Sequence, residues 1–469
     1  MSIFGPMNAI RLGLAALGLS LVSPALAKAP VLVENIGPKD RAILIRDNRI
    51  AYSGPRADVP LAEGAQVIDA EGAFAIPGLI DMHVHVWGHA ELAAYLLHGV
   101  TTVRNLSGMP FHLRMAEAIE SGALLGPRLY TSGPILNSLG PNQQINHQIV
   151  QTADEARAAV EAQHSAGFDR IKTYSNLTAD AYAGALAAAR KHGMRITGHT
   201  PEGERLAGIP SHRDFQISFA EVLGHGFETI EHAESIVFHG LRDRRDKQAG
   251  LALARRIADA GVPVTATLVA QRNLVRMAQT RGDFAKRDGT QWLNPVTQAM
   301  EAESIAFWSG QDPSSEAEKA EFYAWFTKAM HDAGVPIVAG ADAGIFSNIP
   351  GASLHDELEL LVEAGLTPAE AIDAATSGAA KALGEEGRLG CSNEGCAADL
   401  VMLACDPRED ISCIRRTVAV VRNGRWYGPA DLDVLRSRAA DHDREQTIAD
   451  LVEGMAAQGT PLDPAVLGS

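Results

Sequence analysis

The feature that most constrains the fold of this chain is a short apolar run, residues 75–85, that ends in His83 and His85. Side chains of a β-strand alternate between its two faces, so these imidazoles share one face if the strand continues to its end. Two imidazoles at the end of a buried strand supply half of a metal site. The other ligands must come from elsewhere in the chain.

The middle of the chain alternates strand-like and helical stretches, a pattern typical of parallel βα units. Two helical stretches, 153–166 and 179–191, are rich in alanine, which favours helix. Eight stretches have the character of strands: 74–85, 100–106, 128–133, 170–174, 195–199, 229–232, 262–268 and 335–342. Eight such units predict a closed (β/α)8 TIM barrel, which we place at residues 74–384. The stretches 201–222 and 270–325 are longer than a βα connection requires and are candidates for lids over the site.

Both ends of the predicted barrel are rich in β-like runs. Residues 28–73 contain short runs separated by turn residues, and residues 385–428 contain two more, followed by the hairpin-type turn Asn423-Gly424. We predict an α/β fold in which the barrel carries a small composite β-sandwich domain built from both ends of the chain. Residues 429–469 are expected to form a helical segment that packs on the barrel or on a partner chain.

Residues 1–27 have the features of a signal peptide. Arg11 supplies a positive charge, residues 12–21 an apolar stretch, and residues 25–27 (Ala-Leu-Ala) a cleavage site. The alternative is a membrane anchor, but the apolar stretch is short for a membrane span. We therefore expect export to the periplasm or the medium, with no membrane attachment once the signal is removed.

The net charge of the chain is −16, and no basic patch stands out. This balance argues against nucleic acid or an anionic membrane as a partner, and a small-molecule substrate is expected instead. No stretch specifies an interface between copies of the chain, so a homo-oligomer stays open.

All four cysteines lie late in the chain, at Cys391, Cys396, Cys405 and Cys413. An even number of cysteines in an exported chain predicts disulfides. Proximity in the sequence favours pairing Cys391 with Cys396 and Cys405 with Cys413. A four-cysteine zinc site is the alternative, although these spacings are not those of the usual zinc knuckles.

Reactive groups of a (β/α)8 barrel lie at the carboxyl ends of its strands. Five predicted strands end in side chains that can bind a metal or transfer a proton: His83 with His85, Lys172 with Tyr174, His199, His232 and Asp342. A single histidine is more often a buried polar group satisfied by hydrogen bonds than a ligand. Equivalent positions on five strands reverse that expectation and predict one shared site.

These strand-end motifs resemble those of the amidohydrolase superfamily in its binuclear-metal form. The matching motifs are PGLIDMHVH (77–85), IKTY (171–174), ITGHT (196–200), IEHA (230–233) and GADAG (340–344), with further similarity at 351–359, 374–376, 398–401 and 406–407. The chain resembles in particular the prolidase-like and imidazolonepropionase-related members. The resemblance covers nearly the whole chain after residue 27.

The resemblance implies two divalent metal ions with the following ligands: His83, His85 and Asp342 for one ion, and His199 and His232 for the other. Lys172 would carry a carbamate formed with carbon dioxide, whose two oxygens bridge the ions. The alternative is a salt bridge between unmodified Lys172 and a carboxylate. Zinc is the expected metal for imidazole and carboxylate ligands, and manganese, iron or cobalt suit the same set.

The same resemblance implies hydrolysis of an amide. A hydroxide shared by the metals would attack the carbonyl, and Asp342 would carry its proton to the leaving nitrogen. Tyr174 lies two residues after the lysine and shares its strand face, so it either donates to the substrate carbonyl or packs over the barrel mouth. His147 lies in the loop after the third strand and is expected to face the substrate. Arg104 and Asn105 end the second predicted strand and could reach the site, but hydrogen-bonding support of the rim is the favoured interpretation.

We therefore expect an exported, metal-dependent amidohydrolase that cleaves an amide bond of a small N-acyl amino acid or dipeptide. X-Pro dipeptides are the most specific hypothesis. One alternative is hydrolysis of a cyclic amide, lactone or organophosphate ester at the same centre. Another is a non-catalytic periplasmic metal-binding protein, although the proton-transferring Asp342 argues against it. The fold alone does not decide among them.

Overall fold

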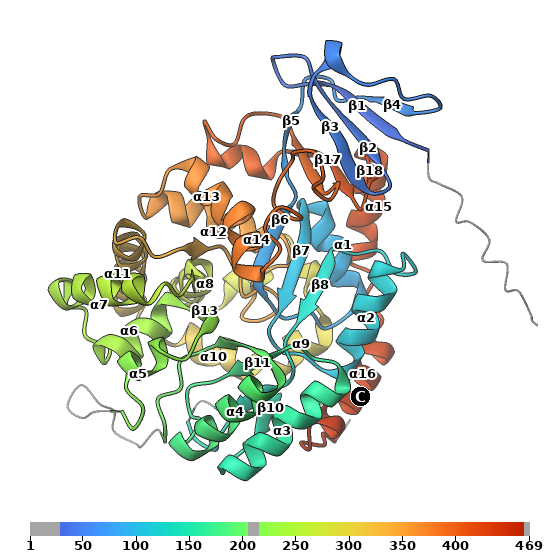
Figure 1. Cartoon of the computed structure of the whole chain (residues 1–469). Helices are drawn as coiled ribbons and strands as arrows, with labels where there is room; N and C mark the ends of the chain where they lie inside the picture. Colours follow the sequence, from blue (N-terminus) through green and yellow to red (C-terminus); the bar gives the residue numbers. More distant parts are fainter. Residues whose placement is uncertain (1–28, 142, 205–214, 464–469) are drawn as a thin grey trace, which may run out of the picture.

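The computed structural model of the chain describes residues 29–141, 143–204 and 215–463. The predicted signal peptide and residues 205–214 of one candidate lid lie outside the described residues. Figure 1 shows strands surrounded by helices, with a β-rich unit at one end of the molecule. None of the described helices combines the length and the apolar character needed to cross a membrane.

Eight parallel strands of the described residues form the barrel: β6 (Leu79–Val84), β7 (Val100–Asn105), β8 (Arg128–Thr131), β11 (Arg170–Thr173), β12 (Arg195–Gly198), β13 (Phe227–Glu231), β14 (Val264–Thr265) and β15 (Ile337–Val338). Ladders join β6-β7-β8 and β11-β12-β13-β14-β15. Backbone bonds close the two seams: Met82 N–H donates to Ala339 O over 3.0 Å, and Gly133 N–H donates to Arg170 O over 2.9 Å. The chain therefore has a TIM-barrel-type α/β fold, as predicted. Short strands β9 (Ile135–Asn137) and β10 (His147–Ile149) extend the sheet beside β11.

Helices cover the outside of the barrel and connect its strands (Figure 1). They include α1 (His89–Leu97), α2 (Pro110–Glu120), α3 (Ala153–Ala166), α4 (Ala179–His192), α5 (Phe219–Leu223), α6 (Ala233–Leu241), α7 (Lys247–Ala260), α12 (Ala352–Glu363), α13 (Pro368–Ala374) and α14 (Ser377–Leu383). The helices predicted at 153–166 and 179–191 are confirmed as α3 and α4. Thr152 caps α3 by accepting the N–H of Glu155, and Gly193 closes α4 with a φ of +65°.

The stretch 74–85 was predicted to form one strand, but it forms two. β5 (Phe74–Pro77) pairs antiparallel with β16 (Leu400–Leu403), and only β6 belongs to the barrel. Pro77 cannot donate a ladder bond. At Gly78, a Cβ would lie 2.1 Å from Thr101 Oγ1, so only glycine allows this close approach. The first strand of the barrel therefore starts at Leu79.

The β-rich ends form sheets that share one apolar cluster. One sheet has the order β3-β2-β1-β4, from β1 (Val31–Ile36), β2 (Arg41–Arg46), β3 (Arg49–Pro55) and β4 (Gln66–Asp69). The other has the order β18-β17-β16-β5, with β17 (Thr417–Arg422) and β18 (Arg425–Tyr427). Val33 and Ile43 belong to the same cluster as Leu400 and Val421. That these two sheets form a separate composite β-sandwich domain stays a prediction.

Disulfides and two late helices complete the C-terminal part. Cys391 is bonded to Cys396 and Cys405 to Cys413, the pairs that proximity in the sequence favours. The helical segment divides into α15 (Pro429–Ala439), which packs on α1, and α16 (Arg444–Ala457), which packs on α2. Both helices therefore lie against the barrel of their own chain.

The long connection between β14 and β15 is largely helical. It contains α8 (Leu268–Gln279), α9 (Pro295–Met300), α10 (Ala302–Ser309) and α11 (Pro313–Asp332). The stretch 262–268, predicted as one strand, is only the two-residue β14, and Leu268 already begins α8. Because α8 packs against both α10 and α11, this connection forms a wall of the barrel mouth rather than a loose loop.

Candidate metal centre

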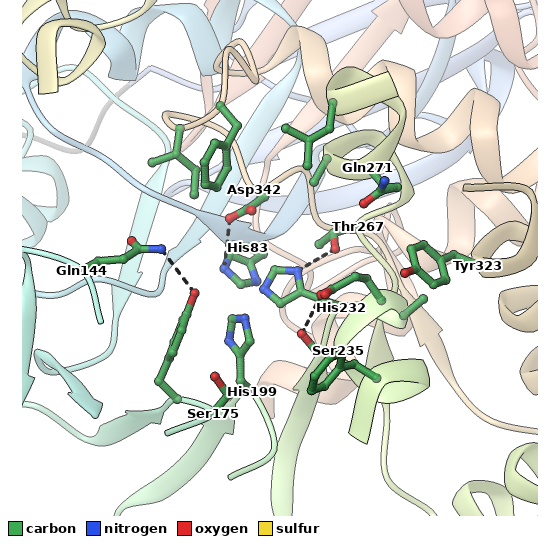
Figure 2. Close-up of a pocket in the computed structure, with 18 of the residues that line it drawn as sticks. His83, Gln144, Ser175, His199, His232, Ser235, Thr267, Gln271, Tyr323 and Asp342 are labelled. Carbon is green, nitrogen blue, oxygen red and sulfur yellow. Dashed lines mark hydrogen bonds and ion pairs between the residues drawn. The ribbon is translucent and has the colours of Figure 1, made fainter. Parts of the chain in front are cut away.

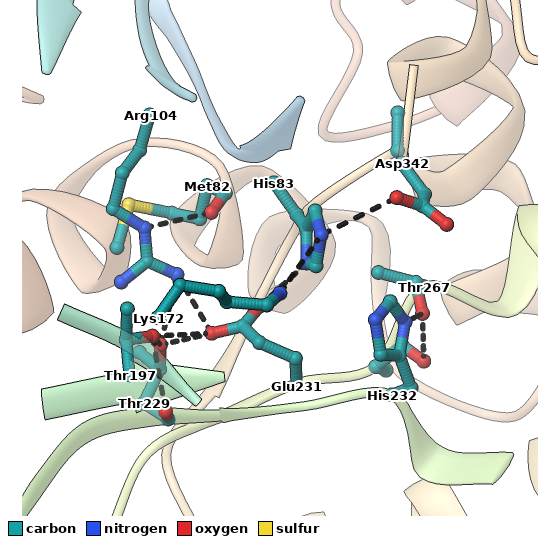
Figure 3. Close-up of polar contacts among 12 residues, drawn as sticks. Met82, His83, Arg104, Lys172, Thr197, Thr229, Glu231, His232, Thr267 and Asp342 are labelled. Atoms are coloured by element: carbon teal, nitrogen blue, oxygen red, sulfur yellow. Dashed lines mark hydrogen bonds and ion pairs between the residues drawn. The ribbon is translucent and has the colours of Figure 1, made fainter. Parts of the chain in front are cut away.

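The barrel brings the predicted strand-end residues together around one cavity. Figure 2 shows His83, His199, His232 and Asp342 there, and Figure 3 shows Lys172 beside His83. They come from the ends of β6, β11, β12, β13 and β15: His83, His85, Lys172, His199, His232 and Asp342. Five of these side chains are less than a tenth exposed, and His199 is partly buried. Five separate elements thus place their polar side chains at one edge of the barrel, as the sequence predicted.

His83, His85 and Asp342 form what we call the three-ligand half of the centre. Their candidate ligand atoms all lie within 4.8 Å of one another. Asp342 Oδ1 lies 3.3 Å from His83 Nε2 and 3.0 Å from His85 Nε2. Burial would raise the pKa of Asp342, but the two neighbouring imidazoles hold it well below its usual range. The carboxylate is therefore ionised and available as a ligand.

His199 and His232 form the two-histidine half. Their ring centroids are 4.5 Å apart, and the His232 ring lies 4.6 Å from that of His83. Burial lowers the pKa of His232 to about 4, so its imidazole is neutral near pH 7 and able to bind a metal. Nδ1 of His199 is buried without a hydrogen-bond partner among the described residues. An unpartnered buried imidazole nitrogen beside three further imidazoles and a carboxylate fits a site for divalent metals.

Lys172 lies beside the three-ligand half of the centre. Its Nζ is 3.4 Å from His83 Nε2, so Lys172 contacts an imidazole rather than the carboxylate of the salt bridge considered as an alternative. Burial lowers the pKa of Lys172 to about 8. A larger fraction of the Lys172 amine is therefore neutral near pH 7, which makes it a better nucleophile than the amine of an ordinary lysine.

Glu231 holds His83 in its orientation. The sequence alone did not predict this role. Its Oε2 accepts from His83 Nδ1 over 2.8 Å, which leaves His83 Nε2 to face the centre. Its Oε1 accepts from Arg104 over 2.9 Å, and also from the hydroxyls of Thr197 and Thr229 (Figure 3). The signal was present in the sequence, because Glu231 directly precedes His232 in the IEHA motif.

Arg104 lies inside the barrel rather than at its rim, where the sequence analysis placed it. Its side chain is fully buried, donates to Met82 O over 2.8 Å, and bridges Glu231 and Glu228. Asn105 does support the strand ends, since its side chain accepts the N–H of Val86 over 3.0 Å. The Arg104 guanidinium balances the negative charge of the Glu231 carboxylate, which orients His83.

Three successive strand ends at the centre have a left-handed backbone. His232, Thr267 and Asp342 have φ values of +68°, +50° and +51°. Such values are uncommon outside glycine and are most unusual for a β-branched threonine. Thr267 Oγ1 lies 2.7 Å from His232 Nδ1 and so holds the second histidine. Strain of this kind persists where surrounding contacts enforce a functional arrangement.

The cavity beside the centre has a volume of about 410 Å³. Tyr174 lines it, with its ring 4.0 Å from that of His199 and its hydroxyl accepting from Gln144 Nε2 over 3.3 Å. His147 does not line it: the ring is fully buried, 4.5 Å from the Tyr174 ring, and accepts the backbone N–H of Gln144. His147 therefore lies behind Tyr174, and Gln143 and Gln144 of the same loop line the cavity instead.

Comparisons with known proteins place this geometry among hydrolases. The model of the family described as "Amidohydrolase family" matches residues 74–427. An uncharacterized protein of Mycobacterium tuberculosis is 24% identical over 430 residues, covering 85% of this chain and 99% of the relative. The imidazolonepropionase of Rubrobacter xylanophilus is 26% identical over 392 residues, covering 77% of this chain and 84% of the relative. The structure of a putative prolidase from Bifidobacterium longum has a TM-score of 0.63 at 23% identity, covering 87% and 98% of the two chains.

Proposed function

Because this chain belongs to the Amidohydrolase family and is a hydrolase acting on carbon–nitrogen bonds, we propose that it cleaves the amide bond of a small N-acyl amino acid or dipeptide. X-Pro dipeptides are the first substrates to test, since an Xaa-Pro dipeptidase is among the similar structures. The observation that carries the proposal is the convergence of the six strand-end side chains on one cavity. We also propose that residues 1–27 direct export of the chain.

The two halves of the centre would hold one divalent metal ion each, with zinc the expected metal. His83, His85 and Asp342 would bind one ion, and His199 and His232 the other. Such ions activate water as a nucleophile and polarise a carbonyl. The Lys172 amine would add to carbon dioxide with loss of a proton. The resulting carbamate would replace a buried cation, which metals repel, by an anion with two oxygen ligands.

The chain's own residues would handle the proton and the carbonyl. Asp342 Oδ would accept the proton of the attacking water and deliver it to the leaving nitrogen. The Tyr174 hydroxyl lines the cavity and would donate to the carbonyl oxygen as negative charge develops there. Gln144, which already donates to that hydroxyl, would fix its orientation.

The test is mass-spectrometric turnover of a pooled library of dipeptides and N-acyl amino acids by protein without residues 1–27, supplied with zinc and bicarbonate. Asp342→Asn protein runs beside it as a control. We expect cleavage of a defined subset that is lost in the control. If two metals are bound but no amide is cleaved, the proposal fails, and cyclic amides, lactones and phosphoesters become the substrates to test. Metal binding without turnover of any of these classes would identify a metal-binding protein.

A further inference from the structure

We propose that the cavity contains an apolar subsite for a bulky aromatic or branched aliphatic group on the leaving-amine side of the scissile amide. This inference rests on the proposed function, because the two sides of the amide are assigned relative to Asp342. The subsite consists of half-buried side chains that line the cavity and that we call the apolar wall: Phe238, Leu274, Trp308, Ile345 and Phe346. Part of each side chain is exposed to the cavity and would be covered by an apolar ligand.

Much of the apolar wall comes from the connection between β14 and β15. Helix α8 supplies Leu274, α10 supplies Trp308, and α11 adds Tyr323 at the edge of the cavity. A βα connection needs only about two to six residues, so these helices exceed what the barrel requires. Because α8 packs against α10 and α11, these residues are held on packed helices at the barrel mouth.

Phe238 of the apolar wall lies on α6, and the last two residues of the wall lie in the loop after β15, which has an unusual backbone. Phe346 and Ser347 have φ values of +48° and +61°, uncommon for residues other than glycine. Glu301 accepts the N–H of Phe346 over 2.8 Å, and Arg287 donates to Ser347 O over 2.6 Å. Both partners belong to the β14–β15 connection. The connection that supplies Trp308 therefore also holds Phe346 at the cavity.

The other side of the cavity is polar, and Glu202, whose N–H donates to Ser175 O over 2.9 Å, adds a carboxylate to it. Gln143, Gln144, Tyr174 and Ser175 line it from the loops after β9 and β11. Figure 2 shows Gln144 across the histidines from Tyr323. A cavity divided in this way binds a ligand in one orientation, with its apolar group against the wall and its amide oxygens or hydroxyls on the polar side.

The position of Asp342 determines which side of the scissile amide contacts the apolar wall. Ile345 and Phe346 follow Asp342 in the same loop, whereas Tyr174 lies on the polar side. In the proposed reaction Asp342 protonates the leaving nitrogen and Tyr174 donates to the carbonyl oxygen. The amine half of the substrate, including the side chain of an amino acid, therefore lies against the apolar wall.

Binding of two non-hydrolysable tetrahedral analogues tests this assignment without depending on turnover. Zinc-loaded protein is titrated by calorimetry with N-(methylphosphonyl)-L-phenylalanine and with N-(methylphosphonyl)glycine, which differ only on the amine side. We expect the phenylalanine analogue to bind at least about tenfold more tightly, the discrimination that an apolar pocket achieves. Trp308→Ala and Leu274→Ala should each remove most of that ratio. Phe307→Ala should leave it unchanged, because Phe307 neighbours Trp308 but is 60% exposed and does not line the cavity.

The outcomes separate this inference from the proposed function. Cleavage of library amides with equal affinity for the two analogues would overturn the apolar subsite and leave the hydrolase proposal standing. A preference for the phenylalanine analogue that depends on Trp308 and Leu274, without any amide cleavage, would support the subsite and overturn the reaction. A preference retained in both variants would also overturn the subsite as assigned here.

Discussion

The two halves of the metal centre differ in how firmly the chain holds them. In the three-ligand half, His83 is held through Nδ1 by Glu231 and His85 through Nδ1 by Ser107, and both imidazoles meet Asp342. In the two-histidine half, His232 is held by Thr267, and His199 Nδ1 has no partner among the described residues.

This difference indicates that the chain alone arranges one candidate metal site and supplies only part of the second site that we propose. Three ligands with fixed orientations bind a metal at little cost in conformational entropy. Two imidazoles need a further ligand, which the carbamate proposed on Lys172 would supply. We therefore expect the three-ligand half to bind zinc more tightly, and the predictions below perturb each half separately.

The largest effect is expected from Asp342→Asn, which removes the carboxylate of the three-ligand half. Turnover should fall about a thousandfold, since both the proton transfer and a charged ligand are lost. Steady-state kinetics measures the fall, and thermal unfolding checks that the variant is folded. Activity near that of the unmodified protein would contradict the role of Asp342.

Glu231→Gln should weaken zinc binding to the three-ligand half by roughly 10- to 100-fold, because His83 loses the carboxylate that orients it. Glu228→Gln is the matched control. The side chain of Glu228 on β13 is also only 4% exposed and accepts from Arg104 over 2.9 Å, but it makes no contact with His83. Competition with a metal-binding dye gives both affinities. Equal losses in the two variants would show that only the buried ion pairs matter.

Ser107→Ala and Thr267→Val should have the smallest effects, one in each half. Each removes one hydrogen bond to a ligand histidine, worth about 1 kcal/mol, so roughly a fivefold loss of zinc affinity is expected. Ser107→Ala should affect the tighter binding step and Thr267→Val the weaker one. If both variants changed the same step, the separation into two halves would be wrong.

The alternation of side chains along a β-strand explains why the barrel and the candidate ligands were predictable from the sequence. Side chains such as His83 and His85 recur with a period of two and lie where parallel strands end, so local patterns identify them. Glu231 and Arg104 were missed in their roles because their partners lie on other strands, more than a hundred residues away. Contacts between strands that are far apart in the sequence do not change the local periodicity of the sequence, so this periodicity cannot predict them.

Boundaries of the elements were less predictable than their order. The run 74–85 was predicted as one strand, yet Pro77 and the crowded Gly78 divide it between two sheets. The connection between β14 and β15 was predicted only as a candidate lid. Its helices pack on the barrel mouth and add Trp308 to the cavity, a tertiary arrangement that length alone could not predict.

The most direct test of the central claim is a zinc titration of metal-free protein in the presence of bicarbonate, with amide hydrolysis followed at each step. The account predicts two bound zinc ions per chain, with the first bound more tightly. It also predicts that hydrolysis rises only as the second equivalent is added, because both halves take part in the reaction. Full activity after one equivalent, or activity that survives removal of all metal, would contradict the account.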